Sequence, residues 1–173
     1  MSKTKNNKIK IFALVALFIA AFAVNMIQIP AANAADSWTL TIDGRSLKAY
    51  PDLREYVWQE NVSTTPNALY DQIGLHRLVS TNATTKGVVF MLPGIYGNGE
   101  KLVSNPPDSN FTLTENMSQC VYWANRGFDV YTIDYRTHFV PSTLNASQLS
   151  FMVDWGLEQM ISDIKQAVDK TKQ

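Results

Sequence analysis

Two strand-like segments with a helix-like segment between them constrain the fold of this chain more than any other feature. Residues 87–92 read GVVFML, an apolar run without polar alternation, and residues 128–136 read FDVYTIDYR. A run that does not alternate is typical of a strand buried on both faces, as in a sheet covered by helices. Apolar residues at helical spacing lie between the two segments and again after the second. This β–α–β–α order predicts an α/β fold with a mostly parallel sheet flanked by helices.

Both helices can be bounded from the sequence. The first is expected to begin with Thr114 as its N-cap and to end before Gly127. Its apolar face would hold Met117, Cys120, Val121 and Ala124. Cys120 is the only cysteine, so it cannot form an intrachain disulfide and is interpreted as a core residue. The second helix is expected after Asp154 as N-cap, with an apolar stripe of Val153, Leu157, Met160, Ile161, Ile164, Ala167 and Val168.

The segments before residue 87 read as further strands, with one ambiguity. Residues 38–42 alternate and predict a half-buried strand, with a turn at Asp43-Gly44. Residues 53–60 are ambiguous and could form one or two helical turns. Residues 72–79 predict a strand, and the segment TNATTKG after it suits a hairpin connection to residues 87–92.

The N-terminus has the pattern of a secretory signal peptide. Four lysines within the first ten residues precede a short apolar run, residues 11–24, and an A-x-A site, residues 32–34. We therefore expect residues 1–34 to be a signal peptide, 35–69 an N-terminal extension with a strand, and 70–173 the main domain. An uncleaved membrane anchor is the alternative, although the apolar run is short for a span. Either way, the domain is expected outside the cytoplasm, secreted or membrane-anchored.

Composition adds two expectations about partners and modification. Without residues 1–34 the chain is mildly acidic and has no basic tract, which excludes a nucleic-acid-binding surface of the usual kind. The sequence also contains more N-x-S/T sites than its composition predicts, which favours a glycosylated, exported protein. The possible N-glycosylation sites are Asn61, Asn82, Asn110, Asn116 and Asn145.

The loop after residues 87–92 is rich in glycine. Residues 91–100 read MLPGIYGNGE, with three glycines and a proline within seven residues. Such a loop can be a simple tight turn. It can also be a loop whose backbone N–H groups face a ligand or a reacting oxygen. The loop alone does not decide between these two interpretations.

Taken together, these segments resemble the N-terminal half of an α/β-hydrolase, and most closely the lipase and esterase branch. The resemblance covers about residues 70–173. It is carried by LPG after the buried strand, YWANRGFDV in the first helix and strand, IDYR at the strand end and the long helix near Trp155. Its most specific part is NRGFDVYTIDYR, residues 125–136.

The resemblance implies a role for the glycine-rich loop. In this family the loop after the third strand supplies one backbone N–H of the oxyanion hole. Ile95 would carry the donating N–H here, with Tyr96 as the alternative. The oxyanion loop would comprise Pro93, Gly94, Gly97 and Gly99. In this interpretation Gly94 lets the backbone turn, whereas Gly97 and Gly99 leave room for the acyl group of the substrate.

The resemblance also implies a reaction, from which this sequence departs. The reaction would be acyl transfer from a small-molecule or lipid ester to a serine and then to water, without a cofactor. However, the sequence contains no G-x-S-x-G motif, which in this family follows the next strand and precedes the catalytic acid and histidine. No catalytic triad residue is therefore assigned, and the fold is expected to be incomplete at the C-terminus. The alternatives are a non-catalytic fragment or binding protein of the same fold.

Neither histidine is expected to be the catalytic base. His76 falls in a predicted strand and is interpreted as structural. His138 follows the strand end, where a pocket would open, and is a possible substrate contact. Asp134 and Arg136 are interpreted as a structural polar pair that fixes the strand end. The carboxylates show no spacing that indicates a metal site.

Overall fold

The computed structural model describes residues 37–62, 69–94, 97–103 and 117–173. These residues belong to one compact unit, Ser37–Gln173. The expected signal peptide, the expected oxyanion donors Ile95 and Tyr96, and the sites Asn110 and Asn116 lie outside the described residues. Among those that are described, no helix has the length and apolar character needed to cross a membrane.

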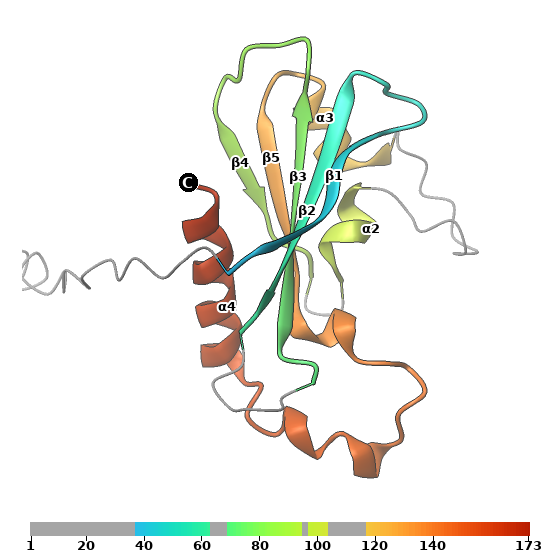
Figure 1. Ribbon diagram of the computed structural model, residues 1–173, viewed down its shortest axis with the longest axis vertical. Helices are drawn as coiled ribbons and strands as arrows, with labels where there is room; N and C mark the ends of the chain where they lie inside the picture. Colours follow the sequence, from blue (N-terminus) through green and yellow to red (C-terminus); the bar gives the residue numbers. More distant parts are fainter. Residues whose placement is uncertain (1–36, 63–68, 95–96, 104–116) are drawn as a thin grey trace, which may run out of the picture. The chain divides into compact units, whose positions relative to one another are not determined.

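A single mixed sheet forms the centre of this unit (Figure 1). Its strands lie in the order β1-β2-β3-β5-β4, with bounds β1 (Thr39–Ser46), β2 (Leu53–Asn61), β3 (Gln72–Ser80), β4 (Val88–Met91) and β5 (Asp129–Asp134). Only the β4–β5 pair is parallel, and the other three pairs are antiparallel. The expectation of a mostly parallel sheet is therefore wrong for the described strands. Short connections join β1, β2 and β3, and such connections produce antiparallel neighbours.

The expected hairpin between β3 and β4 is also wrong. β5 lies between these two strands, with Gly74 opposite Asp134 on one side and Met91 opposite Thr132 on the other. All six residues of β5 are buried, whereas Val88 of β4 is exposed. The fully buried strand takes the central position, and the connection from β3 leads to the outer strand.

The two N-terminal strands differ from the sequence expectation: β1 is longer than predicted, and β2 was not assigned as a strand. β1 continues through Asp43 and Gly44, which form an irregularity of the pairing with β2 and not a turn. Gly44 has a φ of +69°, a conformation that glycine adopts readily. The ambiguous segment 53–60 belongs to β2, which pairs with β3 along its whole length. The sheet therefore runs continuously through the expected boundary between residues 69 and 70.

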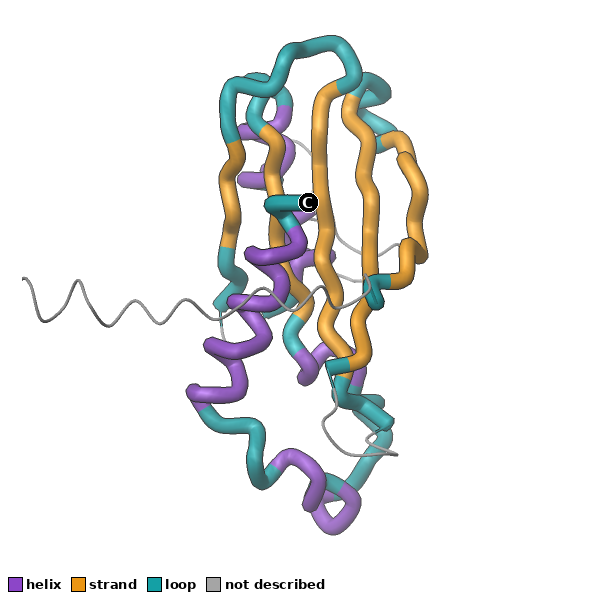
Figure 2. The backbone as a smooth tube through the Cα atoms, turned by 60° about the vertical axis from the view of Figure 1, so that its left-hand side comes forward, coloured by secondary structure: helices purple, strands orange, loops and turns teal. Residues whose placement is uncertain are grey.

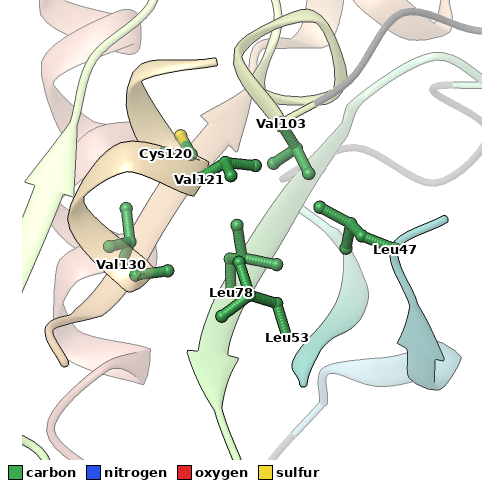
Figure 3. Packing of buried hydrophobic residues seen from close by; sticks show 8 residues of the cluster. Leu47, Leu53, Leu78, Val103, Cys120, Val121 and Val130 are labelled. Carbon is green, nitrogen blue, oxygen red and sulfur yellow. The ribbon is translucent and has the colours of Figure 1, made fainter. Parts of the chain in front are cut away.

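Helices cover both faces of the sheet (Figure 2). α4 (Leu157–Lys170) packs on one face through Met160, Ile164 and Ala167. α2 (Gly99–Val103) and α3 (Gln119–Ala124) pack on the other face. The core on that second face contains Leu47, Leu53, Leu78, Val103, Cys120, Val121, Ala124 and Val130 (Figure 3). Two apolar layers thus enclose the sheet, which confirms the α/β class.

Both helices begin later than the sequence predicts. Ser118 is the N-cap of α3 and accepts a hydrogen bond from the Val121 N–H, so the helix does not start at Thr114, which lies outside the described part of the chain. Met117 precedes the helix and is 66% exposed, which contradicts its place in the expected core. The expected helix end is confirmed, because Gly127 has a φ of +86°.

The predicted stripe of α4 is only partly buried. Gly156 is the N-cap and no side chain caps the helix, so Asp154 does not have the expected role. Ala167 is fully buried, but Leu157 and Ile161 are 72% and 57% exposed. Val153, before the helix, is exposed as well. The helix therefore covers the sheet with one edge of the stripe and leaves the other edge uncovered.

Candidate active site

The glycine-rich loop leaves the sheet at the end of β4 and is anchored to the end of β5. Pro93 is buried, and its carbonyl oxygen accepts a hydrogen bond of 3.1 Å from the hydroxyl of Tyr135. The Gly97 N–H donates to the Gly94 carbonyl at 2.7 Å. The Gly99 N–H donates to Asp134 Oδ1 at 2.7 Å. Asp134, the last residue of β5, and Tyr135, the residue after it, therefore hold the two ends of the loop.

The three loop glycines have different surroundings. A Cβ at Gly94 would meet none of the described residues within 4 Å. A Cβ at Gly97 would lie 3.1 Å from the Pro93 Cβ and 3.2 Å from the Gly94 oxygen, so glycine allows Gly97 to approach these two residues closely. A Cβ at Gly99 would lie 3.0 Å from both His76 and Thr132. Gly99 therefore packs against the sheet, which corrects the expectation that it leaves room for an acyl group.

A buried charge cluster lies beside this loop, and sequence reasoning did not assemble it. It consists of Arg45 on β1, Glu55 on β2, His76 on β3 and Asp134 on β5. His76 Nδ1 lies 2.8 Å from Glu55 Oε1, and its Nε2 lies 2.7 Å from Asp134 Oδ2. Arg45 Nη2 lies 2.6 Å from the second oxygen of Glu55. Except for Arg45, these side chains are almost entirely buried.

The cluster shifts the pKa values of its members. Burial alone would lower the pKa of His76, but hydrogen bonds to Asp134 and Glu55 and the charges of these carboxylates raise it to about 9. Burial alone would raise the pKa of each carboxyl group. Contacts with His76, joined by Arg45 at Glu55 and by His138 and the Glu100 N–H at Asp134, outweigh this effect and hold the pKa of both carboxyl groups below the usual value. The cluster is therefore a charged, mutually paired group at neutral pH.

His138 lies on the 3₁₀ helix η2 (Arg136–Phe139), next to the end of the glycine-rich loop. The Asn98 Oδ1 accepts the Lys101 N–H at 3.0 Å, which directs Asn98 Nδ2 toward His138 Nδ1 at 2.6 Å. His138 Nε2 lies 4.0 Å from Asp134 Oδ2, and its side chain is 30% exposed. The structure thus brings His138 to the loop, while its contact with a substrate stays a prediction.

Arg136 does not pair with Asp134, contrary to expectation. It binds Asp163 on α4 through Nε at 2.6 Å and Nη2 at 2.9 Å, and Asp71 through Nη1 at 2.6 Å. The Trp155 indole N–H also donates to Asp71, at 3.0 Å. Arg136 therefore joins the start of β3 to α4. Beside it lies a pocket lined by Tyr135, Arg136, Thr137, Trp155, Gly156, Gln159, Met160 and Asp163.

Two members of the site were missed because their signals are weak. Glu55 occupies an inward position of β2, where a charged residue conceals the alternation that marks a strand. Asn98 stands directly before α2, and Asn before a helix is a capping signal, but α2 has only five residues. His76 could be recognised as structural but not as charged, since its two partners lie 21 and 58 positions away.

The remaining predicted residues have clear environments. Cys120 is buried 3.6 Å from the Met91 sulfur, and burial raises the pKa of its thiol to about 12, which confirms the core assignment. Asn61, Asn82 and Asn145 are exposed. Within the described ranges, no group of three His, Cys, Asp or Glu side chains is placed to hold a metal ion.

Comparison with solved structures gives the fold a reference. The chain is similar to the crystal structure of a putative lipase from Sulfolobus solfataricus, with a TM-score of 0.69 and 34% sequence identity. The match covers 79% of this chain and 39% of that protein, so it spans well under half of the length of its relative. No family model and no curated protein matches the sequence. The described strands and helices therefore have an α/β-hydrolase-like fold.

Proposed function

We propose that this chain is the N-terminal part of an exported serine hydrolase that cleaves carboxylic esters of lipids or small molecules. The similarity to the lipase structure carries the proposal, because 34% identity extends over 79% of the chain. The position of the glycine-rich loop supports it. This loop follows β4 and precedes α2, the place from which a backbone N–H reaches the oxyanion hole of an α/β-hydrolase.

The loop would stabilise the negative charge that develops on the carbonyl oxygen of an ester. Backbone N–H groups suit this task because they are fixed before the reaction and need no reorganisation. Pro93 and Gly99, on either side of the proposed donors, are hydrogen-bonded to Tyr135 and Asp134. Ile95 remains the proposed donor, with Tyr96 as the alternative. Losing one such donor raises the barrier by about 3 kcal/mol.

A non-catalytic role is the second candidate, and one observation favours it. The sequence contains no G-x-S-x-G motif, and without a nucleophile an oxyanion loop can polarise a carbonyl but cannot form an acyl-enzyme. As it stands, the chain is therefore expected to be inactive as a serine hydrolase. Activity would need a nucleophile, an acid and a base from sequence beyond these residues.

The two candidates are separated by labelling with a fluorophosphonate probe and by hydrolysis of p-nitrophenyl esters. We expect neither labelling nor turnover with the 173-residue chain. We expect both with a longer product of the same gene that adds a strand and a G-x-S-x-G motif. Stoichiometric labelling of a serine within the present sequence, abolished by mutation of that serine, would contradict the proposal. A gene without such a motif would support the non-catalytic candidate.

In an active longer product, Gly94→Val tests the loop itself. No described residue lies within 4 Å of a Cβ at Gly94, so the substitution should leave folding intact. A bulky residue beside the reacting carbonyl should lower kcat by at least about tenfold, with a smaller effect on KM, because the oxyanion contact strengthens in the transition state. A folded variant whose kcat stays within about threefold of wild type would remove this loop from the mechanism.

The proposal includes export, with cleavage after Ala34 and mature chains starting at Ala35. The lysine-rich start, the short apolar run and the A-x-A site support it. N-terminal sequencing of the exported protein tests the cleavage. Recovery of an intact N-terminus in the membrane fraction would favour the anchored alternative. Treatment with a glycosidase would show whether the exposed Asn61, Asn82 and Asn145 carry glycans.

A further inference from the structure

We propose that His76 is a positioning residue, held as an imidazolium between Glu55 and Asp134, and that this buried cation fixes the start of α2 and the end of the glycine-rich loop. Its link to catalysis rests on the proposed function. The structural part of the proposal does not depend on that function, because it concerns only the proton on His76, the two carboxylates and the two backbone N–H groups that Asp134 binds.

The geometry of His76 requires donors on both ring nitrogens. Each nitrogen lies within 2.8 Å of a carboxylate oxygen, one from Glu55 and one from Asp134. A neutral imidazole has a single N–H, so its second nitrogen would direct a lone pair at a carboxylate. The imidazolium donates at both positions and satisfies both contacts.

The charges around His76 also favour the cation. Among the described residues, the charged and titratable groups around His76 are Arg45 from β1, Glu55 from β2, Asp134 from β5, His138 from η2 and the thiol of Cys120 from α3. With His76 protonated, two cations balance two carboxylates. With His76 neutral, one of the buried carboxylates would lack a cation, which is costly at this degree of burial.

Asp134 transmits this arrangement to the loop. Its Oδ2 binds His76, while its Oδ1 accepts the N–H of Gly99 at 2.7 Å and that of Glu100 at 3.2 Å. One carboxylate thus binds the cation on β3 and the first backbone donors of α2 at the same time. If the cation were lost, Asp134 would lose the partner that holds its orientation.

Two glycines keep the space that this arrangement needs. A Cβ at Gly74 would lie 2.8 Å from Asp134 Oδ2, so glycine leaves room for the carboxylate on the neighbouring strand. A Cβ at Gly99 would lie 3.0 Å from the His76 Cδ2, so glycine lets the start of α2 approach the ring. Both close approaches converge on the His76–Asp134 contact.

The first test is an NMR titration of the imidazole nitrogens. The chain has only two histidines, so the variants His76→Gln and His138→Gln assign the two rings. We expect the His76 ring to show the imidazolium signature from pH 6 to pH 8 and to lose its proton near pH 9. We also expect Glu55→Gln to lower that pKa, because the ring then faces one carboxylate. A neutral His76 ring at pH 7 in the wild-type chain would overturn the proposal.

The second test is hydrogen exchange of the Gly99 and Glu100 amides, expressed as protection factors at pH 7. We expect His76→Gln to reduce both protection factors by at least tenfold. His138→Gln is the matched control, because His138 Nε2 lies 4.0 Å from Asp134, and we expect a change below threefold. Unchanged protection in a folded His76→Gln variant would overturn the proposal.

If His76→Gln does not fold, the wild-type chain still gives an answer. Protection of the two amides should then decrease between pH 7 and pH 10 along the same titration curve as the ring nitrogens. Protection that is independent of the ring titration would overturn the proposal. None of these measurements uses an ester or a nucleophile. A failure here is therefore distinguishable from a failure of the proposed function.

Discussion

Single residues show how this chain accommodates charge in its interior. Glu55, His76, Asp134, Arg136 and Asp163 are all buried, and each has at least one oppositely charged partner. Burial of an unpaired charge costs several kcal/mol, so removal of one partner exposes that cost. These residues were recognisable in the sequence as polar, but their partners were not, because most pairs join positions far apart in the chain.

The stability of the chain should decrease as pH rises from about 6.5 to about 9. Folding raises the pKa of His76 from its usual 6.5 to about 9, so its stabilising contribution is complete below pH 6.5 and lost as pH passes through 9. The contribution amounts to roughly 3 kcal/mol if the whole shift is realised. Urea unfolding at pH 6.5 and pH 9 measures it. The decrease should persist in His138→Gln and be much smaller in His76→Gln, and a flat wild-type profile would contradict the expectation.

Arg136→Ala should destabilise the chain strongly. The substitution leaves Asp163 buried without its cation and removes a partner of Asp71, which predicts a loss of about 3–5 kcal/mol in the free energy of unfolding. Lys165→Ala is the control, because Lys165 and Asp169 form an exposed i,i+4 pair. Its effect should stay within about 0.5 kcal/mol. Similar effects of the two substitutions would show that Arg136 is not a structural anchor.

At the scale of elements, local patterns predicted strands and helices where apolar residues dominate the segment. The strands β4 and β5 and the helix α4 were expected from their apolar residues, but β4 is partly exposed and not buried on both faces as the sequence suggested. β2 was ambiguous because Glu55 faces the interior, where its charge is paired with Arg45 on β1 and His76 on β3. The turn assigned to Asp43-Gly44 failed because a bulge in a strand uses the same residues as a turn.

The glycine-rich loop offers a test of element placement. Gly99→Ala would bring a Cβ to 3.0 Å from His76 and Thr132 and to 3.1 Å from the Ile133 backbone, so the start of α2 must shift. We expect a loss of about 1–3 kcal/mol in the free energy of unfolding. The added Cβ in Gly94→Ala meets no described residue within 4 Å, so this substitution should change stability by less than about 0.5 kcal/mol. Thermal unfolding of both variants decides the matter, and an equal tolerance would mean that α2 does not pack as closely as the contacts indicate.

At the scale of the whole molecule, the family resemblance predicted more than local patterns could. It gave the glycine-rich loop after β4 a proposed role and indicated the α/β-hydrolase-like fold that the lipase comparison supports. Strand order could not be read from the sequence, because β5 pairs with both β3 and β4 through contacts between distant segments. The residues near the loop were identified, but the cluster that anchors it depends on those pairings.

The uncovered half of the α4 stripe predicts self-association of the 173-residue chain. Leu157 and Ile161 are largely exposed on this helix, and β4 lies at one end of the order of the described strands. Exposed apolar groups and a strand edge both favour contacts between chains.

Ile161→Gln should therefore raise the concentration up to which the chain stays monomeric, as measured by light scattering, with little change in stability. Ile164→Gln is the matched control, because Ile164 lies on the same helix but packs against the core that contains Leu75. It should instead lower the free energy of unfolding by about 2–3 kcal/mol and increase aggregation. If both substitutions destabilise the chain equally, Ile161 is buried in solution by a partner that covers this face.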